Sequence, residues 1–243
     1  MEAAAIHGCN QRADCVEFSH GLLAKPLRLE QRGATSGDFV QGTSSVIWPA
    51  ASRLAVYLCD HPDLIQNKSV LELGAGLGLV GAACAAAGAK PVLVTDCERA
   101  LPLLHQNQAL LAQDSILLDV GRLEWGLAAD HERILEGYPQ GFDLVVGSDI
   151  ILSSFDLDKL FESCRALLSR TKDSRLLLAF EFREDWESIG NFIGWAEEAG
   201  MEVHHEELGG LAELRADVCG WRRKCGGPLI PGGPAGEESA CLP

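Results

Sequence analysis

Residues 69–78 read Ser69-Val70-Leu71-Glu72-Leu73-Gly74-Ala75-Gly76-Leu77-Gly78, a short apolar run followed directly by alternating glycines. The apolar run is typical of a buried strand, and the small residues from Leu77 to Ala87 predict a helix that Gly88 ends. Glycines between a strand and a helix let the backbone turn sharply and approach a ligand beside the helix N-terminus. This stretch therefore predicts an α/β sheet with a ligand site at the end of its first strand.

The spacing of the glycines narrows the class of ligand. Leu79 stands where the dinucleotide fingerprint requires its third glycine, and the Gly-Lys-Ser/Thr of a phosphate-gripping loop is missing. Glu72, just before the loop, would repel a pyrophosphate but attract the positively charged methionine end of S-adenosylmethionine. The alternative is a glycine turn that binds no ligand.

Asp96 closes the second apolar run, Pro91 to Thr95. A carboxylate at this place can accept hydrogen bonds from both hydroxyls of a ribose. Its alternative role is to cap the helix that follows. Asp96 and the glycine loop together predict a nucleoside site at the carboxyl ends of the first two strands.

The rest of the chain alternates strand-like and helix-like segments, which predicts a doubly wound, Rossmann-like α/β fold with a mostly parallel seven-stranded sheet and helices on both faces. The later strands are expected at residues 115–119, 142–148, 175–182, 201–207 and 216–221. Helices are expected at residues 98–111, 156–168, with Asp156 as N-cap, and 185–199.

The expected α/β domain, with the predicted ligand site, spans residues 66–224, and two regions flank it. Residues 1–65 form an extension with short strand-like pieces and an amphipathic helix from Ser45 to Cys59. Residues 225–243 are rich in glycine and proline and are expected to be disordered.

The composition of the 243 residues indicates which binding partners and which cellular compartment to expect. A formal net charge of −15 argues against nucleic acid and favours a basic protein substrate, although acidity also serves solubility. No apolar run approaches the roughly 20 residues of a membrane span, and the N-terminus does not resemble a signal peptide. Nine cysteines without a Cys-x-x-Cys pair indicate reduced thiols and no metal site. We therefore expect a cytoplasmic protein, with the nucleus as the alternative.

Three further motifs accompany the glycine loop. They are Ile47-Trp48-Pro49-Ala50-Ala51, Leu123-Glu124-Trp125-Gly126 and Gly147-Ser148-Asp149-Ile150. With these in this order, residues 41–224 resemble the class I, seven-stranded methyltransferases, and among them the methyltransferase-like protein lysine methyltransferases. The resemblance implies S-adenosylmethionine as the cofactor.

The resemblance also implies roles for single residues. Trp48 and Trp125 would flank the adenosine, because aromatic faces suit an adenine ring and a sulfonium charge; core packing is the alternative for each. Asp149 would hold the acceptor amine by charge-assisted hydrogen bonds, or else cap the next turn. The full set implied for the cofactor is Trp48, Glu72, Gly74, Gly76, Gly78, Asp96, Trp125 and Ser148.

One departure from the family concerns the acceptor channel. The family places an aromatic residue three positions after the acidic residue, where this chain has Leu152, with Phe155 three residues later. We expect Leu152, Phe155 and Glu181 to line the channel, with Phe155 as the candidate for the missing ring. A solvated carboxylate is the alternative for Glu181.

The sequence thus predicts a protein-lysine N-methyltransferase that acts by direct in-line transfer on a cytosolic protein, such as a chaperone or translation factor, and is a monomer. The end of the fourth strand lacks the Asn/Asp-Pro-Pro-aromatic element of enzymes that hold a flipped base. Alternatives are a small-molecule methyltransferase, an arginine methyltransferase and a noncatalytic binding module of the same fold. Against the arginine alternative, the sequence offers no convincing pair of glutamates that could clamp a guanidinium.

Overall fold

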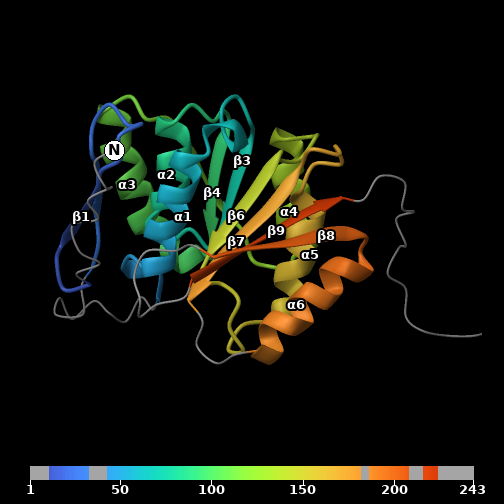
Figure 1. The fold of residues 1–243 in the computed structure, drawn as a ribbon. Helices are drawn as coiled ribbons and strands as arrows, with labels where there is room; N and C mark the ends of the chain where they lie inside the picture. Colours follow the sequence, from blue (N-terminus) through green and yellow to red (C-terminus); the bar gives the residue numbers. More distant parts are fainter. Residues whose placement is uncertain (1–10, 33–42, 182–185, 208–215, 224–243) are drawn as a thin grey trace, which may run out of the picture.

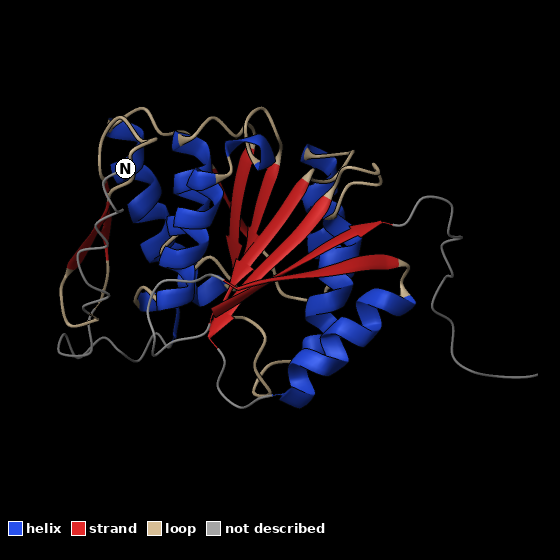
Figure 2. Cartoon of the chain, viewed as in Figure 1, coloured by secondary structure: helices blue, strands red, loops and turns tan. Residues whose placement is uncertain are grey.

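The computed structural model describes residues 11–32, 43–181, 186–207 and 216–223, which form a sheet covered by helices on both faces (Figures 1 and 2). The sheet has seven strands in the order β5-β4-β3-β6-β7-β9-β8. Its strands are β3 (Val70–Leu73), β4 (Val92–Asp96), β5 (Asp119–Arg122), β6 (Leu144–Ser148), β7 (Arg175–Glu181), β8 (Met201–Glu207) and β9 (Ala216–Arg223). The predicted doubly wound, mostly parallel fold is confirmed.

The direction of the strands explains where a ligand site can form. β3 pairs in parallel with β4 on one side and β6 on the other, so Val70 lies opposite both Val92 and Leu144. β9 is antiparallel to its neighbours β7 and β8. The chain thus winds outward from β3 in both directions, and such a reversal of strand order opens a crevice at the carboxyl ends of the strands.

Within the described residues, six α-helices cover the sheet. They are α1 (Pro49–Asp60), α2 (Leu79–Ala86), α3 (Leu101–Gln113), α4 (Ala128–Gly137), α5 (Leu157–Leu167) and α6 (Trp186–Glu198), with short 3-10 helices η2 (Pro62–Leu64) and η3 (Glu98–Ala100). Figure 1 shows α1 to α3 on one face and α4 to α6 on the other. No helix within the described residues has the length and apolarity that a membrane span needs.

Alternating side chains of the strands belong to two buried hydrophobic clusters, one on each face of the sheet. In β3, Val70 packs with the helices α1 to α3, whereas Leu71 and Leu73 pack with α5 and α6. All four residues of β3 are buried. This is the pattern of a strand in the middle of a parallel sheet with both faces covered.

The N-terminal region contributes a hairpin of β1 (Cys15–Phe18) and β2 (Leu27–Glu30), in which Cys15 lies opposite Glu30. Phe18, Leu27 and Leu29 are buried in the same cluster as α1 and α2. The expected boundaries at residues 65 and 224 stay a prediction, and residues 225–243 lie outside the described residues.

Two predicted elements begin four residues later in the structure than expected. The helix expected from Ser45 begins at Pro49, because the residue before a proline disfavours helical backbone and Trp48 is extended (φ −100°, ψ 148°). The third strand, expected at residues 115–119, is Asp119–Arg122, since its register with β4 places Asp119 opposite Leu93. Leu117, inside the predicted strand, is instead 76% exposed.

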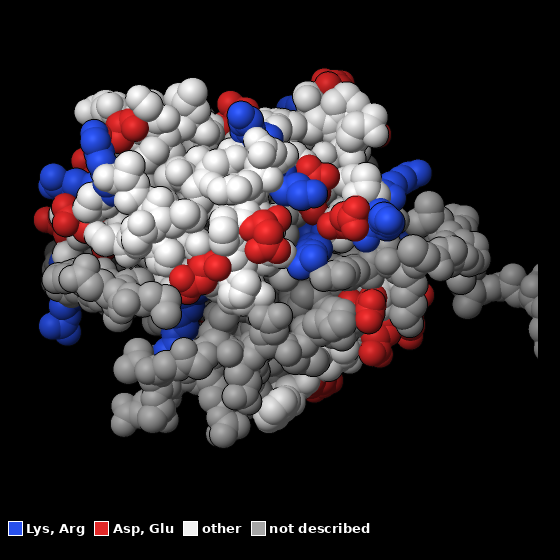
Figure 3. Space-filling view, turned by 45° about the horizontal axis from the view of Figure 1, so that its top comes forward, with Lys and Arg blue, Asp and Glu red and all other residues white. Residues whose placement is uncertain are grey.

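Acidic and basic side chains occur together on the face of the molecule that Figure 3 shows. They are interspersed there rather than gathered by sign. Cysteines 15, 59, 84, 97 and 164, within the described residues, are free thiols, as expected for them.

Candidate active site

A cavity of about 580 Å³ opens at the carboxyl ends of β3, β4, β5 and β6. The loops that follow these four strands line it, together with residues 43–51 at the start of α1. Its place is the crevice beside β3 and β6 where the strand order reverses. The volume lies within the range of pockets that bind cofactors and other small ligands.

Nine of the twelve site residues named from the sequence line this cavity. They are Trp48, Gly74, Gly76, Asp96, Trp125, Ser148, Asp149, Leu152 and Phe155. Of the described residues named from the sequence, Glu72, Gly78 and Glu181 are not among the lining residues. The tertiary structure therefore brings together residues that are up to 107 positions apart, from Trp48 to Phe155.

The backbone of the glycine loop lies close to residues on both sides of it. Gly74 and Gly76 have φ of 60° and 55°. A Cβ on Gly74 would lie 2.8 Å from Ile150 Cγ2, and a Cβ on Gly76 would lie 3.2 Å from the carbonyl oxygen of Ser44. A side chain at either position would strain the backbone and push a cavity wall outward.

Gly78 lies at the end of the glycine loop and does not line the cavity. It is the N-cap of α2, with φ of 83°. A Cβ there would lie 2.9 Å from Leu104 Cδ1, on α3. Gly78 therefore permits the start of α2 and its close approach to α3 rather than contact with a ligand.

Glu72 also lies outside the cavity, which corrects the expectation that it faces the methionine end of the cofactor. Glu72 is 1% exposed, and its Oε2 accepts a hydrogen bond of 2.7 Å from the N–H of Gly81 in the first turn of α2. Burial raises the pKa of Glu72 to about 8, against the lowering by the Gly81 hydrogen bond. Because side chains alternate along a strand, Glu72 points under α2 instead of toward the end of β3.

Asp96 lies at the cavity edge and holds the glycine loop. Its Oδ2 accepts from the N–H of Gly76 and its Oδ1 from the N–H of Cys97, both at 2.8 Å. Burial raises the pKa of Asp96, and these two hydrogen bonds oppose the rise. A carboxylate offers about four acceptor positions, so hydroxyl groups can still bind beside the two backbone donors.

The aromatic residues come from separate walls. Trp48 precedes α1, and its Nε1–H donates to the carbonyl of Thr43 at 2.8 Å. Trp125 follows β5 and meets Phe155 edge-on, with ring centroids 5.6 Å apart and an interplanar angle of 85°. The cavity therefore has indole groups on two sides, which suits a flat heteroaromatic ring.

Asp149 joins the ends of β6 and β7. Its backbone is left-handed (φ 53°), its N–H donates to Ala179 O at 2.8 Å, and its Oδ1 accepts from the N–H of Glu181 at 2.9 Å. Asp149 is 8% exposed and lines the cavity. Glu181 thus supports Asp149 through its backbone, a contact that its sequence position alone did not reveal.

The turn that carries Trp125 is fixed by residues that the sequence alone did not indicate. Asp130 Oδ2 accepts from the N–H of Glu124 at 2.8 Å, and Ser163 Oγ accepts from the N–H of Gly126 at 2.9 Å. His131 Nε2 lies 2.9 Å from the same Ser163 Oγ. Asp130, His131 and Ser163 are all buried. The available signal was the helical pattern of α4, whose buried positions include Asp130, His131 and Ile134.

The outer part of the cavity contains an ion pair. Lys159 Nζ lies 2.6 Å from Asp156 Oδ2, and both residues line the cavity. Asp156 was predicted to cap α5 and does precede it, but its side chain makes no capping hydrogen bond. Its carboxylate instead binds Lys159 one turn further on.

These residues fit S-adenosylmethionine. Gly74 and Gly76 have no side chain to obstruct a ligand, Asp96 offers a carboxylate at the edge, and Trp48 and Trp125 offer aromatic faces. When bound, the cofactor supplies a methyl group on a sulfonium, which is already electrophilic.

Comparison with known proteins agrees with this fit. Residues 29–198 match the model of a family described as lysine methyltransferase. The chain is 35% identical over 182 residues to the protein N-lysine methyltransferase METTL21A of Danio rerio, covering 72% of this chain and 78% of that protein. It is 29% identical over 150 residues to the histone-arginine methyltransferase METTL23 of Xenopus laevis, covering 61% of this chain and 62% of that protein.

Solved structures show the same fold. The S-adenosylmethionine-dependent methyltransferase from Agrobacterium tumefaciens has a TM-score of 0.58 and 17% identity, covering 87% of this chain and 71% of that chain. The family match spans well over half of the sequence and includes the glycine loop, Asp96 and Asp149. The chain therefore belongs to the lysine methyltransferase family and is an enzyme that uses S-adenosylmethionine as its methyl donor.

Proposed function

We propose that the protein methylates a lysine side chain of a protein substrate by direct transfer, with Asp149 as the catalytic residue that holds the acceptor. The observation that carries this proposal is that Asp149 lines the same cavity as the glycine loop. The glycine loop, Asp96, Ser148 and the two tryptophans would hold the cofactor.

Asp149 is suited to orient an amine. Its Oδ1 is fixed by the N–H of Glu181 at 2.9 Å, so the carboxylate has a set direction. A carboxylate accepts charge-assisted hydrogen bonds from an amine, which aligns the nitrogen lone pair and brings it close to the methyl group. The acceptor must lose a proton to solvent before or during transfer, because an ammonium has no lone pair.

The apolar wall beside Asp149 would exclude water from the acceptor. Leu152 and Phe155 are partly buried and line the cavity next to Asp149. Phe155 contacts Trp125, and this contact supports Phe155 as the substitute for the ring expected three residues after Asp149. Leu152 then adds an aliphatic surface for the methylene groups of a lysine.

The proposed substrate is a cytosolic protein with a basic surface, of the class of chaperones or translation factors. The net charge of −15 supports a basic partner. The similarity to METTL21A, named a protein N-lysine methyltransferase, supports lysine as the acceptor.

The test is to incubate the purified protein with methyl-tritiated S-adenosylmethionine and a cytosolic extract, beside the Asp149→Asn variant. Asparagine keeps the acceptor oxygen for the N–H of Glu181 but removes the charge. We expect a discrete labelled protein band that the variant fails to produce, although it still binds the cofactor in calorimetry. Peptide mass spectrometry of the band should then show methyl-lysine.

Arginine methylation is the second candidate, and the similarity to METTL23, named a histone-arginine methyltransferase, is what favours it. Methyl-arginine in the labelled peptide would replace the lysine proposal by this one. Label found only in small molecules would refute both.

A further inference from the structure

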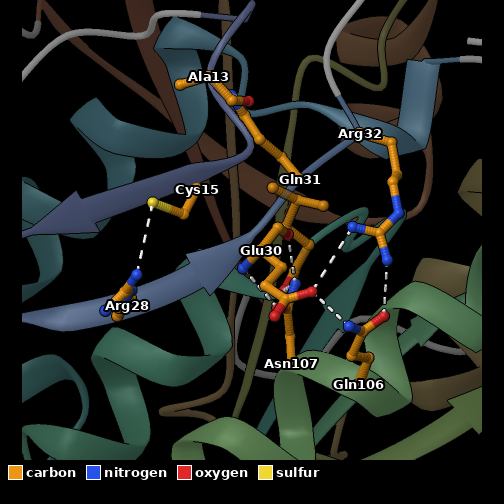
Figure 4. A network of polar contacts seen from close by, with 9 residues as sticks. Ala13, Cys15, Arg28, Glu30, Gln31, Arg32, Gln106 and Asn107 are labelled. Carbon is orange, nitrogen blue, oxygen red and sulfur yellow. Dashed lines mark hydrogen bonds and ion pairs between the residues drawn. The ribbon is translucent and has the colours of Figure 1, made fainter. Parts of the chain in front are cut away.

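Polar contacts of the residues at and just after the end of β2 reach two segments that line the cavity, and Figure 4 shows the contacts to Asn107 and Gln106 on α3. One contact runs through Asn107 on α3, which is 0% exposed. Its Oδ1 accepts from the N–H of Glu30 at 2.8 Å and its Nδ2 donates to Glu30 O at 3.0 Å. The same Nδ2 donates to the carbonyl of Leu77, in the glycine loop, at 3.2 Å. One buried amide thus joins the hairpin to the loop.

The second contact runs through Gln31, which is 1% exposed. Its Oε1 accepts from the N–H of Ile47 at 3.3 Å, and its Nε2 donates to Ala13 O at 2.7 Å. Beside it, the N–H of Arg32 donates to Ser45 O at 2.8 Å. These bonds hold the segment that leads into Trp48.

The two walls that β2 joins face each other closely. Leu77 and Ile47 both line the cavity. The carbonyl of Ser44 lies only 3.2 Å from where a Cβ of Gly76 would be. Any shift of β2 relative to α3 would therefore change the gap between the glycine loop and the tryptophan segment.

Buried amides fix such a spacing well. A buried donor or acceptor that loses its partner costs more free energy than an average hydrogen bond contributes. Asn107 and Gln31 each bind two or more backbone groups from different segments. Neither residue lines the cavity among the described residues, so neither is placed to touch a ligand.

We propose that Asn107 and Gln31 are positioning residues through which the N-terminal hairpin sets the width of the S-adenosylmethionine site. The inference rests on the proposed assignment of the cavity to the cofactor. The hairpin would then determine the geometry of the cofactor site, although its two strands do not belong to the seven-stranded sheet.

The test measures S-adenosylmethionine affinity by calorimetry and stability by urea unfolding for Asn107→Asp, Asn107→Leu and Gln31→Met. Aspartate can accept from Glu30 but cannot donate to Leu77, and methionine keeps the length of Gln31 without its hydrogen bonds. Each variant should weaken binding about fivefold or more, and a variant with both sites changed should show coupling between them. The kcat at saturating cofactor should stay within about twofold of wild type, because only ground-state binding is lost.

Gln106→Ala is the matched control. Gln106 neighbours Asn107 and contacts the same hairpin, accepting from Arg32 Nη2 at 3.0 Å and donating to the carboxylate of Glu30, but its side chain is exposed. This variant should bind the cofactor as wild type does.

Three outcomes separate the explanations. Lower urea midpoints with unchanged cofactor affinity in Asn107→Asp and Gln31→Met would reduce both residues to structural ones and overturn the inference. Equal loss of affinity in Gln106→Ala would overturn it as well, since any disturbance of the hairpin would then suffice. If wild type itself bound no S-adenosylmethionine, the assignment of the cavity would fail instead. Should Asn107→Leu not fold, the two milder variants decide.

Discussion

The indole of Trp125 and the ring of Phe155 meet edge-on, 5.6 Å apart, although they come from the loops after two different strands, β5 and β6. One ring belongs to the proposed cofactor wall and the other to the proposed acceptor channel. The contact therefore couples the two halves of the site.

Phe155→Ala should weaken S-adenosylmethionine binding about 3- to 10-fold, because an aromatic pair contributes ~0.5–1.5 kcal/mol beyond its buried area. Calorimetry on the purified variant measures this directly. Phe155→Tyr, which keeps a ring at the edge of Trp125, should bind nearly as wild type does. Equal affinity in Phe155→Ala would show that Trp125 needs no support.

Asp149→Asn should lower kcat by about 100-fold or more while leaving the Kd of S-adenosylmethionine within about twofold, since the carboxylate is proposed to hold only the acceptor. Single-turnover methylation of the identified substrate gives the rate, and calorimetry gives the Kd. A loss confined to cofactor binding would move Asp149 from the acceptor to the cofactor.

Asp96→Ala should weaken cofactor binding by about tenfold or more and lower the free energy of unfolding by about 1–3 kcal/mol. The variant leaves the N–H groups of Gly76 and Cys97 without their acceptor and removes the proposed ribose contact. Asp96→Asn retains one acceptor oxygen and should lose less stability. Urea unfolding and calorimetry on both variants separate the two effects.

Glu72 should make stability fall as pH rises. Its pKa is about 8 in the folded protein against an ordinary 4.5, chiefly because of burial. Between these values the folded state holds a proton that the unfolded chain has released, so the free energy of unfolding decreases from about pH 4.5 up to about pH 8. Urea midpoints across this range should fall less steeply in Glu72→Gln, which is neutral throughout. Parallel slopes for the two proteins would contradict the assigned pKa.

Ser163→Ala should lower the free energy of unfolding by about 1–3 kcal/mol, because Gly126 and His131 both lose a buried partner. We also expect weaker cofactor binding, since the turn that carries Trp125 is loosened. Unfolding and binding measured on the same preparation decide this. An unchanged unfolding free energy would mean that water or a neighbouring group replaces the hydroxyl.

The sequence determined the fold through residues 69–78. Buried parallel strands need apolar residues on both faces, and only glycines permit the turn that follows, so the pattern leaves few other structures. The same local logic located Asp96 and Asp149, since Asp96 ends β4 and Asp149 directly follows β6. The strand at Asp119–Arg122 was misplaced because an edge strand carries little apolar signal and takes its position from its pairing with β4.

Only the tertiary structure decided which side chains reach the cavity and which support it. Local sequence places Glu72, Gly78 and Glu181 near the site, but whether each residue reaches the cavity depends on strand alternation and on packing against α2 and α3. The contacts of Asn107 with Glu30 and Leu77 join positions that are 77 and 30 residues apart. Such a contact leaves no local pattern, because a buried amide finds its partners only after the segments have packed together.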